Sequence, residues 1–158
     1  MVWIRGVVFT LVVPGVIAGL IPQNILGAAH LQPGWWRAGW LLLFAGVSLY
    51  AVCLLHFLVA HGTPAIFFAR HLCFVLGEEP PALVHIGPYK FSRNPMYLAV
   101  LLIIFGQAIL YASRPVAIYG SCAFACFHLV VTLLEEPHLR AREGQAFDEY
   151  CRRVRRWI

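Results

Sequence analysis

The sequence is poor in charged residues, above all in acidic ones. Only 12% of its 158 residues are charged, and Asp and Glu together number seven. A soluble domain has about 25% charged and about 45–50% apolar residues. Here 61% of the residues are hydrophobic and the mean hydropathy is +0.76. The composition therefore excludes an ordinary soluble domain and indicates an integral membrane protein.

The sequence also lacks the patterns of several other classes. Its five cysteines are an odd number without disulfide spacing, which argues against a disulfide framework. Cys122 and Cys126 share a helix face, but no His-x3-His pair accompanies them, and buried cysteine mostly acts as a small hydrophobe. No metal site is therefore expected. No repeat or linker divides the chain, so residues 1–158 are predicted to form one domain.

Four apolar runs approach the length of a membrane-spanning helix, which is about 20 residues. They are residues 2–21, 38–60, 96–112 and 115–134. The third run is short, so a half-deep hairpin with the fourth is the alternative. The sequence thus predicts an all-α, polytopic membrane helical bundle of about four transmembrane helices, two of them within residues 1–60 and two forming a helical hairpin over 96–134.

Basic residues are distributed unevenly along the chain. Six of the twelve lysines and arginines lie after Glu136. Four spans would put Arg5, the loop of residues 61–95 and this tail on one side, which the positive-inside rule makes cytoplasmic. Both termini are then cytoplasmic, in a bacterial inner membrane. A basic tail beside membrane helices is routine and indicates membrane lipids rather than nucleic acid as its partner.

Residues 138–158 follow a different pattern. Apolar side chains recur there at helical spacing, and arginines fill much of the remainder. The apolar positions are Leu139, Phe147, Tyr150, Val154 and Trp157. This predicts a C-terminal amphipathic helix that lies at the interface or folds back over the bundle, with Gly144 weakening its middle.

The stretch HIGPYKFSRNPMY, residues 85–97, is polar and lies before the third apolar run. Asn94 is suited to an N-cap and Pro95 to the first helical position, so a helix is predicted to begin here. A helix N-terminus binds anions, and Arg93 adds a guanidinium suited to a carboxylate or phosphate. Gly87-Pro88 predicts a turn. The alternative is that the basic side chains only extend to lipid headgroups.

Two adjacent carboxylates, Glu135 and Glu136, follow the fourth apolar run. Charged groups at the edge of hydrocarbon are costly and indicate function. The pair is predicted to lie at the C-terminus of the fourth helix, where the helix dipole disfavours negative charge, so Arg93 or a cationic ligand would compensate. His128 shares a helix face with Glu135. Together these groups describe a pocket that fits S-adenosylmethionine, although other zwitterions would fit too.

The ordered motifs GPYKFSRNPMY, then EEPHL about 40 residues later, then RRWI, resemble a known family. It comprises the membrane-embedded methyltransferases of the isoprenylcysteine carboxyl methyltransferase and phospholipid N-methyltransferase type. The likeness covers residues 62–158, starting at GTPA. It implies an S-adenosylmethionine pocket on the cytoplasmic side, covered by a C-terminal segment over 135–158. Many members have His where this chain has Asn94.

The resemblance implies a set of cofactor-binding residues. They are His85, Gly87, Pro88, Tyr89, Arg93, Asn94, Pro95, Tyr97, Glu135, Glu136, Leu139 and Tyr150. Catalytic roles fall to Arg93, which would steer a carboxylate acceptor, and to Glu135 and His128, which would take a proton from an amine or thiol.

The expected reaction is methyl transfer to a lipophilic acceptor that enters from the bilayer. The acceptor is an isoprenylcysteine-type carboxylate or a related small lipid. The alternatives are a phospholipid amine N-methyltransferase and a non-catalytic accessory membrane protein that keeps the fold. The longer segment 66–84 is a candidate for contact with the substrate. Neither the acceptor nor the oligomeric state follows from the sequence.

Overall fold

The computed structural model describes residues 8–10, 12–28, 31, 36–60 and 83–158. Most of these residues are helical, and the only β-type pairing among them is one isolated parallel bridge, between Ser92 and Arg155. The elements are η1 (Val16–Leu20), α2 (Ile21–Leu26), α3 (Trp36–Val59), η2 (Gly87–Lys90), α5 (Pro95–Leu110), α6 (Arg114–Val130), η3 (Val131–Glu135), α7 (Glu136–Glu143) and α8 (Gln145–Arg153). The all-α prediction is confirmed for this part of the chain.

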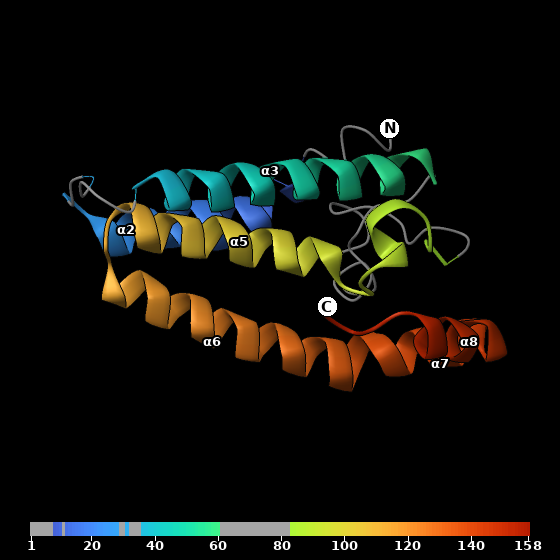
Figure 1. The fold of residues 1–158 in the computed structure, drawn as a ribbon. Coiled ribbons are helices and arrows are strands. Elements are labelled where there is room, and N and C mark those ends of the chain that lie inside the picture. Colours follow the sequence, from blue (N-terminus) through green and yellow to red (C-terminus); the bar gives the residue numbers. More distant parts are fainter. Residues whose placement is uncertain (1–7, 11, 29–30, 32–35, 61–82) are drawn as a thin grey trace.

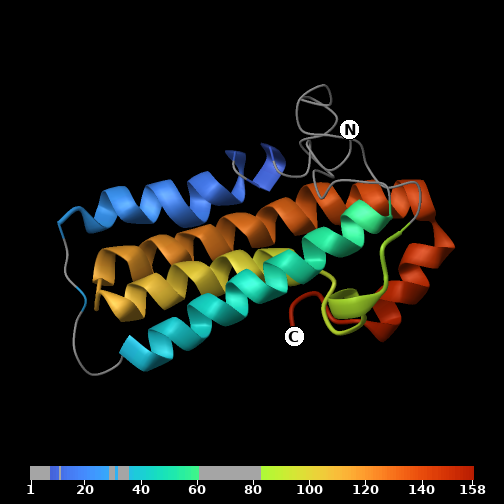
Figure 2. The same ribbon diagram turned by 90° about the horizontal axis from the view of Figure 1, so that it is seen from above.

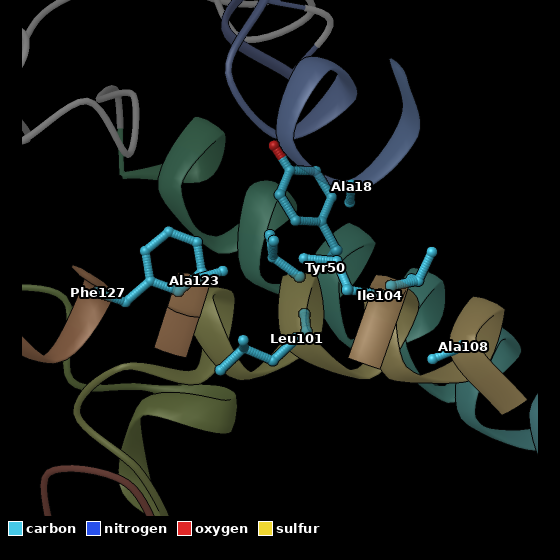
Figure 3. Packing of buried hydrophobic residues seen from close by; sticks show 10 residues of the cluster. Ala18, Tyr50, Leu101, Ile104, Ala108, Ala123 and Phe127 are labelled. Atoms are coloured by element: carbon cyan, nitrogen blue, oxygen red, sulfur yellow. The ribbon is translucent and has the colours of Figure 1, made fainter. Parts of the chain in front are cut away.

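Helix α5 is the centre of the bundle. It packs between α3 and α6, and η1 and α2 lie across the group, in contact with α5 and α6 respectively (Figures 1 and 2). The buried core follows from this arrangement: Ala99 and Ile104 of α5 are completely buried and belong to one cluster with Tyr50 of α3 and Phe127 of α6. Figure 3 shows Ile104, Tyr50 and Phe127 among the side chains of this cluster.

Glycines allow α3 and α5 to approach each other closely. A Cβ atom added to Gly46 would lie 2.8 Å from the carbonyl oxygen of Ala99. One added to Gly106 would lie 2.9 Å from the backbone nitrogen of Leu43. Such distances are too short for real side chains, so the two backbones meet directly, as small residues permit in membrane bundles.

Only two helices have the length and composition to cross a membrane among the described residues. They are Trp36–Val59, with 24 residues, and the continuous helix Arg114–Glu143, with 30. Among the described residues, the shorter apolar helices are Val16–Leu26 and Pro95–Leu110. Sixteen residues in α5 give about 24 Å of helix, less than the roughly 30 Å of a hydrocarbon core. Four complete spans are therefore not established.

The fourth predicted span does not end where the sequence indicated. Helix α6 continues through the π-helical turn η3 into α7. Glu135 and Glu136 therefore lie inside a continuous helix, so the prediction that they lie at a helix C-terminus is wrong. Pro137 lacks the N–H that an α-helix would use there, and the π-turn immediately before it accommodates this change in hydrogen bonding.

The predicted amphipathic helix over 138–158 is also wrong in its extent. The chain breaks at Gly144, which has φ +56°, and forms α7 and α8 as two short helices. Residues 154–158 leave the helix: Val154 is extended, with φ −121° and ψ 131°. A positive φ is cheap only for glycine, which explains why the break falls at this position.

Three side-chain hydrogen bonds hold the first helical segment, which comprises the described residues between 8 and 26, on the bundle. Gln107 Nε2 donates to the carbonyl oxygen of Ala18 at 2.6 Å, and Tyr119 Oη donates to that of Ile17 at 2.8 Å. Tyr50 Oη donates to Thr10 Oγ1 at 3.0 Å. These contacts fix the segment over α3, α5 and α6, where it forms one wall of the cavity described below.

Candidate active site

The site begins at the turn before α5. Gly87 has φ +59°, and a Cβ atom there would overlap the imidazole of His56 on α3. The 3-10 turn η2 that follows directs Tyr89 into the interior, where it is 6% exposed. The predicted turn at Gly87-Pro88 is therefore confirmed. Asn94 and Pro95 begin α5 as predicted, but the Asn94 side chain does not cap the helix.

The Arg93 guanidinium points at the second carboxylate of the pair. Its Nη1 atom lies 3.1 Å from Glu136 Oε1. Nη1 also donates to the sulfur of Cys151. The Nε atom of Arg93 is buried and has no hydrogen-bond partner within the described residues. A buried unpaired donor is costly, so this N–H is available to an acceptor on a ligand.

Glu136 is held more tightly by a residue of the C-terminal tail. Arg156 donates from Nε to Oε1 at 2.7 Å and from Nη2 to Oε2 at 2.8 Å. This is the bidentate geometry that makes Arg–carboxylate pairs strong. Glu136 therefore binds two guanidinium groups, one from the start of α5 and one from the tail.

The tail itself is tied to the residues that precede α5. The Arg93 backbone N–H donates to the carbonyl oxygen of Arg155 at 2.9 Å. Asn94 Nδ2 and Ser92 Oγ both donate to the carbonyl oxygen of Arg156, at 3.0 and 3.3 Å. Residues 92–94 and 155–156 thus run side by side, joined by backbone and side-chain bonds.

Glu135 has a different environment from its neighbour. Its Oε1 atom accepts a hydrogen bond from Tyr97 Oη at 2.5 Å. The Tyr97 ring packs on Phe127 of α6, with ring centroids 4.7 Å apart. Glu135 is 8% exposed, so a carboxyl group with a phenol partner is buried between α5 and the helix that continues α6.

Burial keeps the phenols and the thiol near the tail in their neutral forms. Desolvation raises the pKa of Tyr89 and of Tyr150 well above the usual value for a phenol. Tyr150 Oη accordingly serves as a donor, to the carbonyl oxygen of Tyr89 at 2.6 Å. Burial also raises the pKa of Cys151, against the opposing effect of Arg93. Cys151 therefore stays a thiol at neutral pH and is a poor nucleophile.

Two cavities meet at these residues. The first, which we call the polar cavity, is about 50 Å³. Its charged lining residues are Arg93, Glu135, Glu136 and Arg142, and its rings are Phe57, Tyr89, Phe147 and Tyr150. The second, the apolar cavity, is about 220 Å³. Its walls come from Phe9, Val13, Pro14 and Ile17, from Tyr50 of α3, from Met96, Tyr97 and Val100 of α5, and from Cys126, Phe127 and Val130 of α6.

The two cavities share part of their lining. The shared residues are Phe57, Tyr89, Arg93, Asn94 and Glu135. The cavities therefore lie on either side of these side chains. One side offers charged groups and aromatic rings, and the other offers hydrocarbon, with the Glu135 carboxyl group between them.

The structure brings most of the residues predicted for the site together and leaves some outside. Seven of them line the polar cavity: Tyr89, Arg93, Asn94, Glu135, Glu136, Leu139 and Tyr150. Tyr97 lines the apolar cavity only. Gly87, Pro88 and Pro95 line neither cavity and serve to shape the turn and the start of α5.

The two histidines predicted for the site lie away from both cavities. His85 is exposed, and its Nδ1 lies 3.0 Å from the carbonyl oxygen of Leu83. His128 faces the tail, where its Nδ1 accepts a hydrogen bond from Trp157 Nε1 at 3.2 Å. Most of the segment 66–84, and GTPA at 62–65, fall outside the described residues.

Sequence reasoning missed Arg156, Phe57 and Phe147 as parts of the site. Arg156 is one of six arginines in the tail, and the motif RRWI, residues 155–158, does not show which of its two arginines belongs to the site. Phe57 lies in the middle of an apolar run, where a cavity-lining ring looks like any core residue. Phe147 was predicted to be on the apolar face of the tail helix, and it is 1% exposed.

The described residues contain no group of three or more His, Cys, Asp and Glu side chains placed to hold a metal ion. The two cavities that share lining residues are built from aromatic rings, two carboxylates and arginines.

Comparison with known proteins assigns the family. The chain matches the phospholipid methyltransferase family over residues 41–144. This range includes most of α3, all of α5 and α6, and both glutamates of the site. The chain thus belongs to the phospholipid methyltransferase family. The predicted resemblance is confirmed.

Two curated relatives are similar to half of the chain. The nickel-cobalt-cadmium resistance protein NccN of Alcaligenes xylosoxydans xylosoxydans is 32% identical over 81 residues, which are 51% of this chain and 38% of that protein. The cobalt-zinc-cadmium resistance protein CzcN of Cupriavidus metallidurans is 33% identical over 81 residues, 51% of this chain and 37% of that protein. The match therefore spans less than two fifths of each relative. No solved structure matches the chain.

Proposed function

We propose that this protein is an S-adenosylmethionine-dependent methyltransferase that acts on a lipophilic acceptor at the cytoplasmic face of the membrane. The observation that carries the proposal is the contact between the two cavities. A charged, aromatic cavity and a hydrocarbon-lined cavity share five residues, Glu135 and Arg93 among them. A methyl group transferred from one cavity to the other would therefore pass between these shared side chains.

The polar cavity has the chemistry that the cofactor requires. The free Nε–H of Arg93 suits the carboxylate of the cofactor. Glu136 offers acceptor oxygens for the ribose hydroxyls or the amino group, and the rings of Tyr89 and Phe147 offer cover for adenine. At about 50 Å³ the polar cavity is smaller than the roughly 300–1,000 Å³ of small-molecule sites. The proposal therefore requires its wall to open when the cofactor binds.

The bound cofactor supplies an activated methyl group, and the chain supplies position and a dry environment. The walls of α5 and α6 orient the acceptor in line with the methyl group, which is the main contribution a protein makes to such a displacement. Aromatic and aliphatic side chains around the shared residues exclude water. Glu135 lies at the junction and can accept a proton from the acceptor, either directly or through Tyr97.

The acceptor has a hydrocarbon part, because mostly aliphatic and aromatic side chains line the apolar cavity. They come from the first helical segment, α3, α5 and α6. An isoprenylcysteine-type carboxylate or a related small lipid would bind through Arg93, which lines both cavities. A carboxylate acceptor needs no general base.

A phospholipid amine is the second candidate acceptor, and two observations favour it. The chain belongs to the phospholipid methyltransferase family. Moreover, Arg93 and Arg156 both bind Glu136, whereas Glu135 accepts a hydrogen bond from the Tyr97 phenol. Glu135 is therefore placed to attract an ammonium group and to take its proton. The names of the two curated relatives refer to metal resistance and state no reaction.

The acceptor classes separate in one experiment. Membranes that contain the protein are incubated with S-adenosylmethionine labelled at its methyl group, and the lipids are extracted. A label that mild base releases as methanol is a methyl ester and identifies a carboxylate acceptor. A base-stable label on a lipid headgroup identifies an amine. A chain that binds the cofactor but labels no lipid or protein in native membranes is a non-catalytic accessory protein, and the proposal fails.

A further inference from the structure

We infer that Arg156 is the positioning residue of the polar cavity: it fixes Glu136 relative to Arg93 so that the two can bind one ligand. The inference rests on the proposed function for the identity of that ligand. Arg156 lines neither cavity, so it acts through Glu136 and not by contact with the cofactor.

The side chain of Arg156 fixes the carboxylate. Glu136 is 8% exposed, and both of its oxygens accept from Arg156, at 2.7 and 2.8 Å. A fork of two parallel bonds sets the plane of the carboxylate, which a single bond does not. Arg93 makes one contact with the same group, at 3.1 Å. Arg156 therefore determines how Glu136 is oriented, and Arg93 is left with a free Nε–H.

The backbone of the same residue fixes the other wall. The carbonyl oxygen of Arg156 accepts from Asn94 Nδ2 and from Ser92 Oγ, and the preceding carbonyl accepts from the Arg93 N–H. Asn94 is 8% exposed and Ser92 is 5% exposed. One tail residue thus bonds to the segment before α5 through its backbone and to α7 through its side chain.

This arrangement compensates for a weakness of the fold. Arg93 and Glu136 are 43 positions apart in the sequence (136 − 93). Among the described helices, α7 packs mainly on α8 and η3 rather than on α5. Besides the Arg93–Glu136 ion pair at 3.1 Å, the Tyr97–Glu135 hydrogen bond joins these two regions. The tail adds a further bridge between Glu136 and the residues before α5.

The test compares Arg156→Gln, Arg156→Lys and a control, Arg152→Gln, in the full-length protein in detergent. Arg152 is an exposed arginine of α8, so its loss removes the same charge from the same region. The measurements are the Kd for S-adenosylmethionine and S-adenosylhomocysteine by calorimetry, the KM for the cofactor, kcat with saturating cofactor, and the melting temperature.

We expect Arg156→Gln to weaken cofactor binding about 10- to 100-fold, the effect of losing charge-assisted hydrogen bonds, with kcat at saturation retained. Arg156→Lys keeps the charge but not the two parallel hydrogen bonds, so its affinity for the cofactor should lie between those of the wild type and Arg156→Gln. Arg152→Gln should bind as the wild type does. Hydrogen exchange at the amides of residues 93–97 should rise in Arg156→Gln, because the tail bonds there are weakened.

The outcomes distinguish this inference from the proposed function. If the wild type binds the cofactor and Arg156→Gln binds it within about twofold, the positioning role is wrong and the function stands. A loss of affinity that follows a fall in melting temperature, and that Lys does not relieve, shows a structural role only and also overturns the inference. If the folded wild type binds neither ligand, the proposed function itself is wrong.

Discussion

Tyr97 donates a hydrogen bond of 2.5 Å to Glu135 across the boundary between α5 and the helix that continues α6. Glu135 lines both cavities, whereas Tyr97 lines the apolar cavity alone. The pair thus divides the site into a part that the cofactor would occupy and a part that the acceptor would occupy. Substitutions on the two sides should therefore affect different kinetic constants.

For an amine acceptor, which must lose a proton, Tyr97→Phe should lower kcat and leave cofactor affinity nearly unchanged. The change removes the partner of the Glu135 carboxyl group on the acceptor side, where proton transfer is worth about 10²–10⁴-fold in rate. We expect a loss of kcat of about 10-fold or more, because Glu135 itself remains. The measurements are the initial rate of lipid methylation and the Kd for S-adenosylhomocysteine.

Tyr111→Phe is the matched control for that change. Tyr111 follows the last turn of α5, at the far end of the same helix, and lines neither cavity. Its activity should equal that of the wild type. An unchanged kcat in Tyr97→Phe would show that the hydroxyl group has no part in the reaction, and an equal loss of cofactor affinity would refute the division of the site.

Glu136→Ala should abolish measurable cofactor binding and leave the helical bundle folded. The substitution removes the carboxylate that Arg156 and Arg93 bind, and it leaves two guanidinium groups without that partner. Breaking a buried ion pair costs about 3–5 kcal/mol, so the melting temperature should fall as well. Circular dichroism checks the fold, and calorimetry checks the binding.

Glu149→Gln serves as its control, because Glu149 is an exposed residue of α8 with a 3.5 Å ion pair to Arg153. It should bind the cofactor normally. If Glu136→Ala retained wild-type affinity in a folded sample, Glu136 would have no place in the pocket, and the assignment of the polar cavity to the cofactor would be wrong.

Gly87→Ala should destabilise the protein more than Gly144→Ala does. Both glycines have a positive φ, +59° and +56°, so both substitutions strain the backbone. Only at Gly87 does the new Cβ meet a neighbour, the His56 ring, whereas nothing lies within 4 Å of it at Gly144. The overlap adds about 1–3 kcal/mol. Thermal unfolding in detergent measures the difference, and equal effects would show that His56 moves away freely.

Gly46→Ala should lower the melting temperature, because its Cβ atom would meet the backbone of α5 at Ala99 and force the two helices apart. We expect a cost of about 1–3 kcal/mol, as for other overpacked sites. Gly19→Ala, where nothing lies within 4 Å, should be neutral or stabilising, since Ala is the better helix former. Equal stability of the two variants would contradict the direct contact between α3 and α5.

Local patterns in the sequence were sufficient to predict much of the site. Asn94-Pro95 marks the start of α5 because these residues favour the first turn of a helix on their own. The sequence offered Arg93 or a cationic ligand as the partner of the glutamate pair, and the structure places Arg93 Nη1 3.1 Å from Glu136 Oε1. The core positions of the tail, Phe147 and Tyr150, followed from helical periodicity.

The features that were missed depend on contacts distant in sequence. Arg156 reaches Glu136 only because the tail leaves the helix after Arg153 and runs beside residues 92–94. The helix passes beyond residue 134 because a π-turn precedes Pro137, which no propensity indicates. The turn that ends α5 was not among the missed features. YASRP, residues 111–115, predicts a tight turn between the last two apolar runs, and the structure has a turn there, where Ala112 has φ +46°.

The most direct test of the account is calorimetric titration of the full-length, detergent-purified protein with S-adenosylmethionine and S-adenosylhomocysteine, with Glu136→Ala beside it. The account predicts that the wild type binds both with a Kd of about 1 μM to 1 mM, the range of many enzyme ligands. It also predicts that Glu136→Ala binds neither. A folded wild-type sample that binds neither compound would contradict the central claim, and the chain would then be a member of the family without its cofactor.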